Sequence, residues 1–337
     1  MSRIYCIYII IISTFSILWK RRKEAKWAET TISKIEQQLG GSLSDSAKSR
    51  AIVSYSGFIP MVTDPFLNLH NRYTNNAEKE RILLYFICSS LFDDFSDLDQ
   101  LTNEELYNIS FHPEKYSATQ QEEKLFLYAH QKLKAAVQDQ SEYDKATKRL
   151  FTAQLNSVQQ KNPAISIQEI KEITLEKGGT ATFLCHFYLD EKANDIEQQC
   201  WFLLGSVFQV LDDLMDVHQD LQEGSYTMPI KMKYASESEQ FFTDQIQRLQ
   251  SAIDQLPFHW RNKFTLMMSA MAMYSLGKLA LYQLKKLEIT NTGMPDLKQV
   301  PRKYLIIDME KPMNIWRCIK YIYKDMNIWL KNQKSFT

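Results

Sequence analysis

Runs of apolar residues separated by polar ones follow one another along most of the chain and predict a succession of helices. Gly and Pro, which end or interrupt helices, fall between these segments, as at Gly40, Pro163 and Gly224. Two segments, RILLYFICSSLF (81–92) and CWFLLGSVFQVL (200–211), are apolar nearly all round, which is typical of helices at the centre of a bundle. The pattern predicts helices over residues 24–39, 46–56, 78–98, 120–137, 141–160, 166–189, 193–218, 237–254, 259–287 and 313–332.

The composition also favours an all-α fold. The chain of 337 residues has only 9 Gly and 9 Pro, so turn-forming residues are scarce. This length predicts one large helical domain over residues 24–337, preceded by a separate segment, 1–23. The 40 basic and 40 acidic residues give a net charge of +0, so no nucleic-acid partner is expected. The five cysteines lack CxxC spacing, which argues against a zinc site or a disulfide framework and favours a reducing cytoplasm.

The N-terminal segment differs from the rest of the chain. The stretch Ile4–Trp19 carries no charge, and the basic run KRRK (20–23) follows it directly. This arrangement predicts a membrane anchor over residues 1–23. Because positive charge stays on the cytoplasmic side of a membrane, we expect the remainder of the chain on that side. A peripheral amphipathic helix is the alternative for the same segment.

Each of the two apolar segments ends in the same arrangement of acids. LFDDFSDLD supplies Asp93, Asp94 and Asp97, and FQVLDDLMD supplies Asp212, Asp213 and Asp216. Helical residues four apart share a face, so each segment presents two carboxylates to one point. Gathered carboxylates repel one another unless a cation neutralises them, and Mg²⁺ prefers oxygen ligands. One such motif could be a solvated helix end, but two predict that all six aspartates are metal ligands.

Motifs around the second cluster resemble those of a known enzyme family. Phe208 and Gln209 precede DDLMD as in the FQxxDDxxD pattern of the trans-isoprenyl diphosphate synthases. The segment DLQEGSYTMPI (220–230) is similar to DLxEGKxTxPxI of the same family. Lys177, in LEKGGTATFL, stands where the family has a diphosphate-binding lysine. The chain thus resembles the class I isoprenoid (terpenoid) synthase superfamily, and within it the trans-isoprenyl diphosphate synthases most.

The resemblance implies a class I terpenoid synthase-like bundle of about ten helices around a deep apolar cavity, with both acid clusters at its mouth. Three Mg²⁺ ions would join the acids to the diphosphate of a prenyl substrate. Asp93, Asp212 and Lys177 would then be the catalytic residues, and Gln209 and Lys231 would also bind the substrate. The resemblance is compatible with a homodimer.

In the family that the chain resembles, bulky residues just before the first DDxxD limit chain length, so the resemblance implies that this helix sets the length of hydrocarbon that the cavity accepts. Ser89 lies one turn before Asp93, about 6 Å away along the axis, and Tyr85 lies two turns before it, about 12 Å away. The small Ser89 would leave room, Phe92 would line the cavity, and Tyr85 would be its first possible floor. We therefore expect farnesyl or longer diphosphates as substrates.

Some family residues are missing, which keeps several reactions open. Thr102, Asn103 and Glu104 stand where chain-elongating members have Arg-Arg-Gly, and Ser225 replaces a lysine. Prenyl transfer is the predicted function, with terpene cyclisation and head-to-head coupling of the squalene or phytoene type as alternatives. All three reactions begin with the same ionisation step. An alternative of another class is a non-catalytic, membrane-associated helical protein that binds prenyl lipids.

Overall fold

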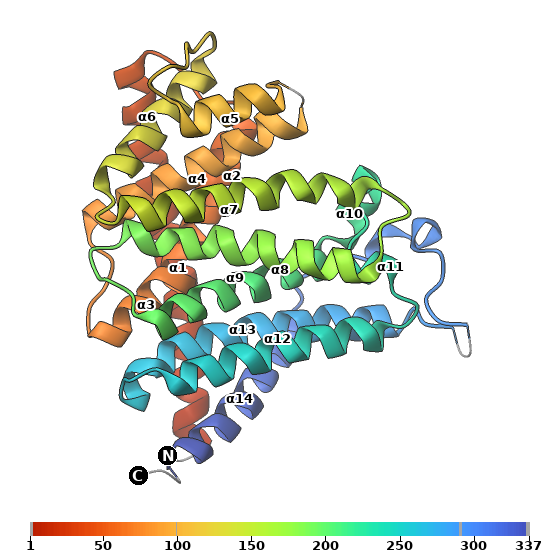
Figure 1. The fold of residues 1–337 in the computed structure, drawn as a ribbon. Coiled ribbons are helices and arrows are strands. Elements are labelled where there is room, and N and C mark those ends of the chain that lie inside the picture. The colour runs from red at the N-terminus through yellow and green to blue at the C-terminus, as the bar shows by residue number, and fades with distance from the viewer. Residues whose placement is uncertain (1–2, 99, 290–291, 335–337) are drawn as a thin grey trace. The chain divides into compact units, whose positions relative to one another are not determined.

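The computed structural model describes residues 3–98, 100–289 and 292–334, of which residues 3–11, 13, 14, 97 and 334 are described by their backbone alone. Within these ranges the regular elements are helices and no β-strand occurs (Figure 1). The prediction of an all-α protein is therefore confirmed.

The long helices agree with the predicted ranges to within a few residues, except that the first begins much earlier. They are α1 (Arg3–Leu39), α2 (Asp45–Phe58), α4 (Asn76–Asp97), α6 (Gln121–Ala136), α7 (Gln140–Ser157), α8 (Ile167–Leu184), α9 (Asp195–Met215), α12 (Ala235–Gln255), α13 (Trp260–Lys285) and α14 (Pro312–Lys334). Shorter helices that the pattern did not predict are α3 (Asp64–Leu67), α5 (Asn103–Phe111), α10 (Val217–Glu223) and α11 (Met228–Lys231). Their few turns carry too little periodicity to be recognised.

The chain divides into two compact units that do not follow its order. Unit 1 comprises Met1–Ile12, Asp144–His186 and Ala193–Thr337, and unit 2 comprises Ser13–Tyr143 and Phe187–Lys192. The short segment Phe187–Lys192, between α8 and α9, thus belongs to unit 2 although both helices belong to unit 1. The first acid cluster lies in unit 2 and the second lies in unit 1.

Each unit contains one of the two helices predicted to be central. In unit 2, Leu83 and Leu91 of α4 are fully buried. In unit 1, Cys200 and Val207 of α9 are also fully buried. The burial expected from their all-round apolar sequence is therefore present in both helices.

The predicted membrane anchor lies largely outside the residues whose side chains are described. Its backbone belongs to α1, which continues without a break from Arg3 through the predicted boundary at residue 23 to Leu39. Of the described helices, α13 alone is long and apolar enough to cross a membrane, and 67% of its most apolar stretch is buried within the protein. A buried helix of this kind is also typical of the core of a helical protein.

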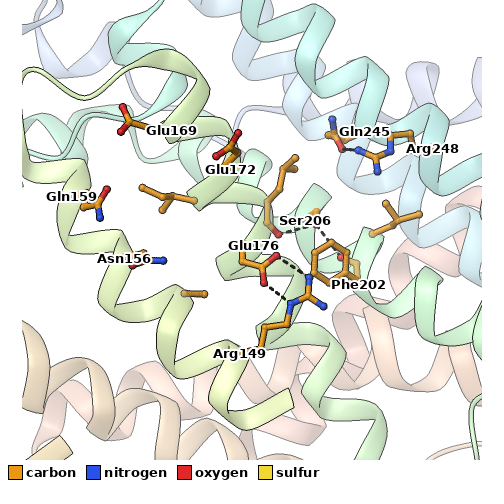
Figure 2. Close-up of a pocket in the computed structure, with 14 residues that line it drawn as sticks. Arg149, Asn156, Gln159, Glu169, Glu172, Glu176, Phe202, Ser206, Gln245 and Arg248 are labelled. Atoms are coloured by element: carbon orange, nitrogen blue, oxygen red, sulfur yellow. Dashed lines mark hydrogen bonds and ion pairs between the residues drawn. The ribbon is translucent and has the colours of Figure 1, made fainter. Parts of the chain in front are cut away.

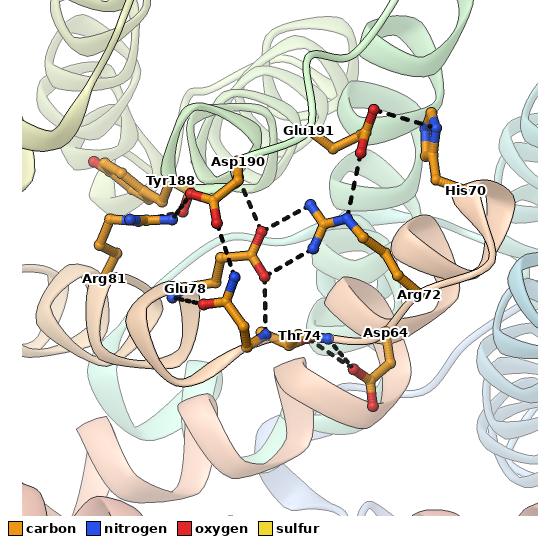
Figure 3. A network of polar contacts seen from close by, with 10 residues as sticks. Asp64, His70, Arg72, Thr74, Glu78, Arg81, Tyr188, Asp190 and Glu191 are labelled. Carbon is orange, nitrogen blue, oxygen red and sulfur yellow. Dashed lines mark hydrogen bonds and ion pairs between the residues drawn. The ribbon is translucent and has the colours of Figure 1, made fainter.

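A buried carboxylate in unit 2 holds the beginning of α4 in place (Figure 3). Glu78 is fully buried and accepts two hydrogen bonds from the Arg72 guanidinium, at 3.0 and 2.9 Å. It also accepts from the backbone N–H groups of Asn75 and Asp190, both at 2.9 Å. Four donors therefore compensate the loss of water around this charge. Because Asp190 belongs to Phe187–Lys192, the network ties that segment to α4.

Removing the charge of Glu78 should destabilise the protein. For Glu78→Gln we expect a loss of about 3 kcal/mol in the free energy of unfolding, because Arg72 loses its buried partner. Glu80→Gln is the matched control, since Glu80 is on the same helix and its ion pair with Lys132 is close to half exposed on both sides. The control should lose less than about 1 kcal/mol in urea unfolding. Equal losses in the two variants would contradict the assigned role of Glu78.

Candidate functional site

Two glycines bring α8 and α9 of unit 1 into backbone contact. A Cβ atom added to Gly178 would lie 2.5 Å from the carbonyl oxygen of Gly205. A Cβ atom added to Gly205 would overlap the carbonyl oxygen of Gly178 and lie 2.5 Å from the Cβ of Thr182. Only glycine fits at both positions without a shift of the helices. This contact places the side chains of α8 beside the acids of α9.

The second acid cluster receives hydrogen bonds from both helices. Thr174 of α8 donates its hydroxyl to Asp213 at 2.9 Å. Gln209, one turn before the acids on α9, donates its amide to Asp212 and to Asp213, at 3.3 Å each. Lys177 lies close enough to Asp212 for its positive charge to offset part of the rise that burial causes in the pKa of that carboxyl. The structure thus brings together four predicted site residues of unit 1 (Lys177, Gln209, Asp212 and Asp213) with Thr174, which was not predicted.

A fourth acid extends this cluster into α10. Asp220 lies one helical turn beyond Asp216 and accepts a hydrogen bond from the Thr227 hydroxyl at 2.9 Å. Burial, together with the charges of Asp216 and Asp212, raises the pKa of Asp220 to about 7. The spacing of residues 212, 216 and 220, four apart each time, could have identified Asp220 from the sequence. We call Asp212, Asp213, Asp216 and Asp220 the α9–α10 cluster.

The α9–α10 cluster holds more negative charge than its surroundings compensate. Burial raises the pKa of Asp213 to about 8, and the charges of Asp220 and Asp212 add to the effect. The protein atoms around Asp212 raise its pKa to about 6, and the charge of Asp216 contributes, although Asp212 is exposed at the surface. The pKa of Asp216 is also raised, by burial and by Glu223. Solvent weakens these effects at Asp212 and Asp216, so buried Asp213 carries most of the argument.

The first acid cluster, at the end of α4 in unit 2, has a different environment. Arg50 of α2 donates to Asp94 at 2.5 Å and to the carbonyl oxygen of Ser90 at 2.9 Å. Asp94 therefore has a positive charge of the protein itself beside it. Asp93 is half-buried, and the side chain of Asp97 lies outside the described part of the chain. No local signal in the sequence pairs residue 50 with residue 94.

The other predicted substrate residues have structural contacts of their own. Tyr85 is buried, and its ring centroid lies 5.6 Å from that of Tyr188. Ser89 and Phe92 are half-buried on the same helix. Lys231 donates to the carbonyl oxygen of Pro163 at 2.8 Å. The predicted binding roles of these four residues stay predictions.

The α9–α10 cluster has the donor chemistry of a Mg²⁺ site. Among the described side chains, no three His, Cys, Asp or Glu residues converge closely enough to form a complete metal site by themselves. Mg²⁺ is commonly held by one or two carboxylates, and water and phosphate oxygens fill the remaining positions. Asp212 and Asp216 would hold such an ion, and its charge would offset the repulsion that raises the pKa values of the cluster.

A separate cavity of about 540 Å³ uses other residues of the same two helices (Figure 2). Glu172 and Glu176 of α8 and Phe202 of α9 line it. Arg149 of α7 forms an ion pair with Glu176, at 2.8 Å between its Nη2 and a carboxylate oxygen, and lies 4.7 Å from the Phe202 ring. None of the residues predicted to act on the substrate lines this cavity, so it is distinct from the α9–α10 cluster.

Comparison of the chain with protein-family models, curated proteins and solved structures found no match.

The close contact between α8 and α9 should not tolerate a methyl group. Gly205→Ala should lower the free energy of unfolding by about 1–3 kcal/mol, because the added methyl group would overlap the Gly178 backbone and one of the two helices would have to move. Gly57→Ala is the matched control: Gly57 also lies in a helix, α2, but a Cβ there meets nothing within 4 Å. The control should be neutral or stabilising by up to about 1 kcal/mol in urea unfolding. A Gly205→Ala protein as stable as the control would show that the contact is looser than described.

The raised pKa values predict that the protein loses stability as the pH rises in the absence of divalent cations. Folded Asp213, with a pKa of about 8, keeps a proton that the unfolded chain, with an Asp pKa of about 4, has released. Stability therefore falls between about pH 5 and 8, by about 1 kcal/mol per pH unit. Unfolding in EDTA at pH 5, 6, 7 and 8 measures this slope.

Asp213→Asn should flatten the slope. Asp195→Asn should leave it unchanged, because Asp195 is an exposed acid at the other end of α9. A wild-type slope of zero, or of opposite sign, would contradict the description of the cluster.

Proposed function

We propose that the protein is a class I isoprenoid synthase-like enzyme that ionises an allylic prenyl diphosphate in a Mg²⁺-dependent reaction, with prenyl transfer as the leading reaction. The observation that carries the proposal is the α9–α10 cluster: acids of raised pKa, with Lys177 beside them, at the end of a buried apolar helix. Such a cluster weakens the folded protein unless a cation binds to it. The motif FQVLDDLMD, which contains three of these acids, and the neighbouring Lys177 support a prenyl diphosphate as the substrate.

The side chains around the cluster have separate tasks in this proposal. Bound Mg²⁺ would stabilise the negative charge that develops on the departing diphosphate. Asp212 and Asp216 would hold the ion, and Gln209 would orient Asp212 through the hydrogen bond at 3.3 Å. Lys177 would attract the diphosphate directly, since its positive charge acts on Asp212 at the same cluster. Thr174 would keep Asp213 in place from the neighbouring helix.

Apolar surroundings are the second requirement of the reaction. Loss of diphosphate leaves an allylic carbocation, which water would quench at once. The apolar residues of α9 that precede the acids would exclude water, and aromatic faces would stabilise positive charge. A class I terpenoid synthase-like bundle, which we propose for the all-α chain, provides this arrangement. The segment 1–23 would anchor the enzyme to a membrane, with the reaction on the cytoplasmic side.

One observation favours a second function. The ion pair between Arg50 and Asp94 engages an acid that the first motif would offer to metal. This would suit a non-catalytic, membrane-associated protein that binds prenyl lipids. The α9–α10 cluster argues for catalysis, because crowded acids serve no purpose in binding a hydrocarbon chain.

The proposal predicts Mg²⁺-dependent release of diphosphate from geranyl, farnesyl or geranylgeranyl diphosphate. Asp212→Asn should lower the rate by at least about 10²-fold, and so should Lys177→Ala, since each removes one preorganised electrostatic contact. Asp195→Asn, at the exposed end of the same helix, should keep the wild-type rate. Extraction of the products then distinguishes prenyl transfer from cyclisation and head-to-head coupling. Absence of diphosphate release from all three substrates, with folded protein and Mg²⁺, would favour the non-catalytic alternative.

A further inference from the structure

Arg50 is held at the first acid cluster by three acceptors from two helices of unit 2. Its Nη2 atom donates to the Asp94 carboxylate at 2.5 Å and to the carbonyl oxygen of Ser90 at 2.9 Å. Its Nη1 atom donates to the Ser46 hydroxyl, one turn earlier on α2, at 2.6 Å. The Nε atom is buried and has no hydrogen-bond partner. The guanidinium is therefore anchored on several sides without being fully satisfied.

The α9–α10 cluster has no equivalent of this arginine. In the part of the chain that the structure describes, no Lys or Arg forms an ion pair with any of its four acids; Lys177 acts on Asp212 without a hydrogen bond. Two motifs with the same DDxxD pattern thus differ in one respect: the first contains a protein cation in contact with a carboxylate, and the second does not. The difference is geometric and does not depend on the protonation of any acid.

We propose that Arg50 is an internal counter-cation that competes with divalent metal for Asp94, so that the α9–α10 cluster binds metal first and the first cluster binds it more weakly. This inference rests on the proposed function, because it assumes that both clusters meet a metal ion. Arg50 acts here as a positioning residue that regulates the first cluster.

The chemistry of arginine makes the competition unavoidable. A guanidinium stays protonated at any pH at which the protein is folded, so Arg50 cannot give way by losing its charge. A metal ion that binds Asp94 must therefore displace the guanidinium or share the carboxylate with it against charge repulsion. The bonds to Ser90 and Ser46 can persist while Asp94 turns away, so only the ion pair has to break. The Arg50 side chain is 39% exposed, which keeps the effect moderate.

The test is Mn²⁺ binding to the full chain in detergent, without prenyl diphosphate, followed by electron paramagnetic resonance. Wild type should show a tighter and a weaker class of sites. Arg50→Gln should lower the Kd of the weaker class by about 5-fold or more, at the low end of ordinary coupling between two ligands. Arg50→Lys should fall between Arg50→Gln and wild type. Lys48→Gln is the matched control, because Lys48 lies on the same helix and pairs with Glu36, outside both clusters.

Two further variants assign the sites. In an Asp94→Asn background Arg50→Gln should no longer change the Kd, since the contested carboxylate is gone. Asp212→Asn should remove the tighter class and leave the weaker class in place. If Arg50→Gln leaves both classes of sites unchanged, or weakens their binding, the competition alone is overturned. The same holds if the effect of Arg50→Gln persists in the Asp94→Asn background. Absence of Mn²⁺ binding at both clusters would contradict the proposed function as well.

Discussion

The carbonyl oxygen of Gly178 lies against the backbone of Gly205, and this contact sets the distance between α8 and α9. Helices separated by ordinary side chains lie about 8–10 Å apart, whereas here the backbones themselves touch. The short distance lets Thr174 of α8 reach Asp213 of α9 with a hydroxyl. Lys177, one turn further on the same helix face, comes within electrostatic reach of Asp212. The contacts of α8 with the acids of α9 depend on this spacing.

Two buried carboxylates of the fold, Glu78 and Asp213, show what distinguishes a structural acid from a functional one. Glu78 is fully buried and accepts from four donors, two of which belong to the charged Arg72. Asp213 is also buried, but among the described side chains it accepts only from Thr174 and, at 3.3 Å, from Gln209. The chain is thus able to satisfy a buried carboxylate and leaves Asp213 incompletely satisfied. An acid kept in this state is ready for a cation that the folded protein itself does not supply.

Local periodicity predicted the helices well but could not predict contacts between them. The ten long segments were recognisable because each carries several turns of apolar pattern, whereas α10 has too few turns. Lys177, Gln209 and Asp212 were found through motif spacing, and the structure brings them together within unit 1. Arg50 was missed because its partner, Asp94, is 44 residues away on another helix. Such a pairing follows from tertiary packing, which no window of sequence contains.

Identical motifs therefore need not be equivalent sites, because the neighbouring elements decide how much charge each motif retains. If both clusters lacked a counter-charge, the metal-free protein would carry carboxylate repulsion in both of its units. Arg50 relieves part of this repulsion in unit 2. In unit 1 the repulsion among the acids stays at the α9–α10 cluster, beside the contact of α8 with α9. There Lys177 offsets only part of the charge, and Asp213 is buried. Of the two clusters, the α9–α10 cluster is consequently the one that a bound cation would stabilise more.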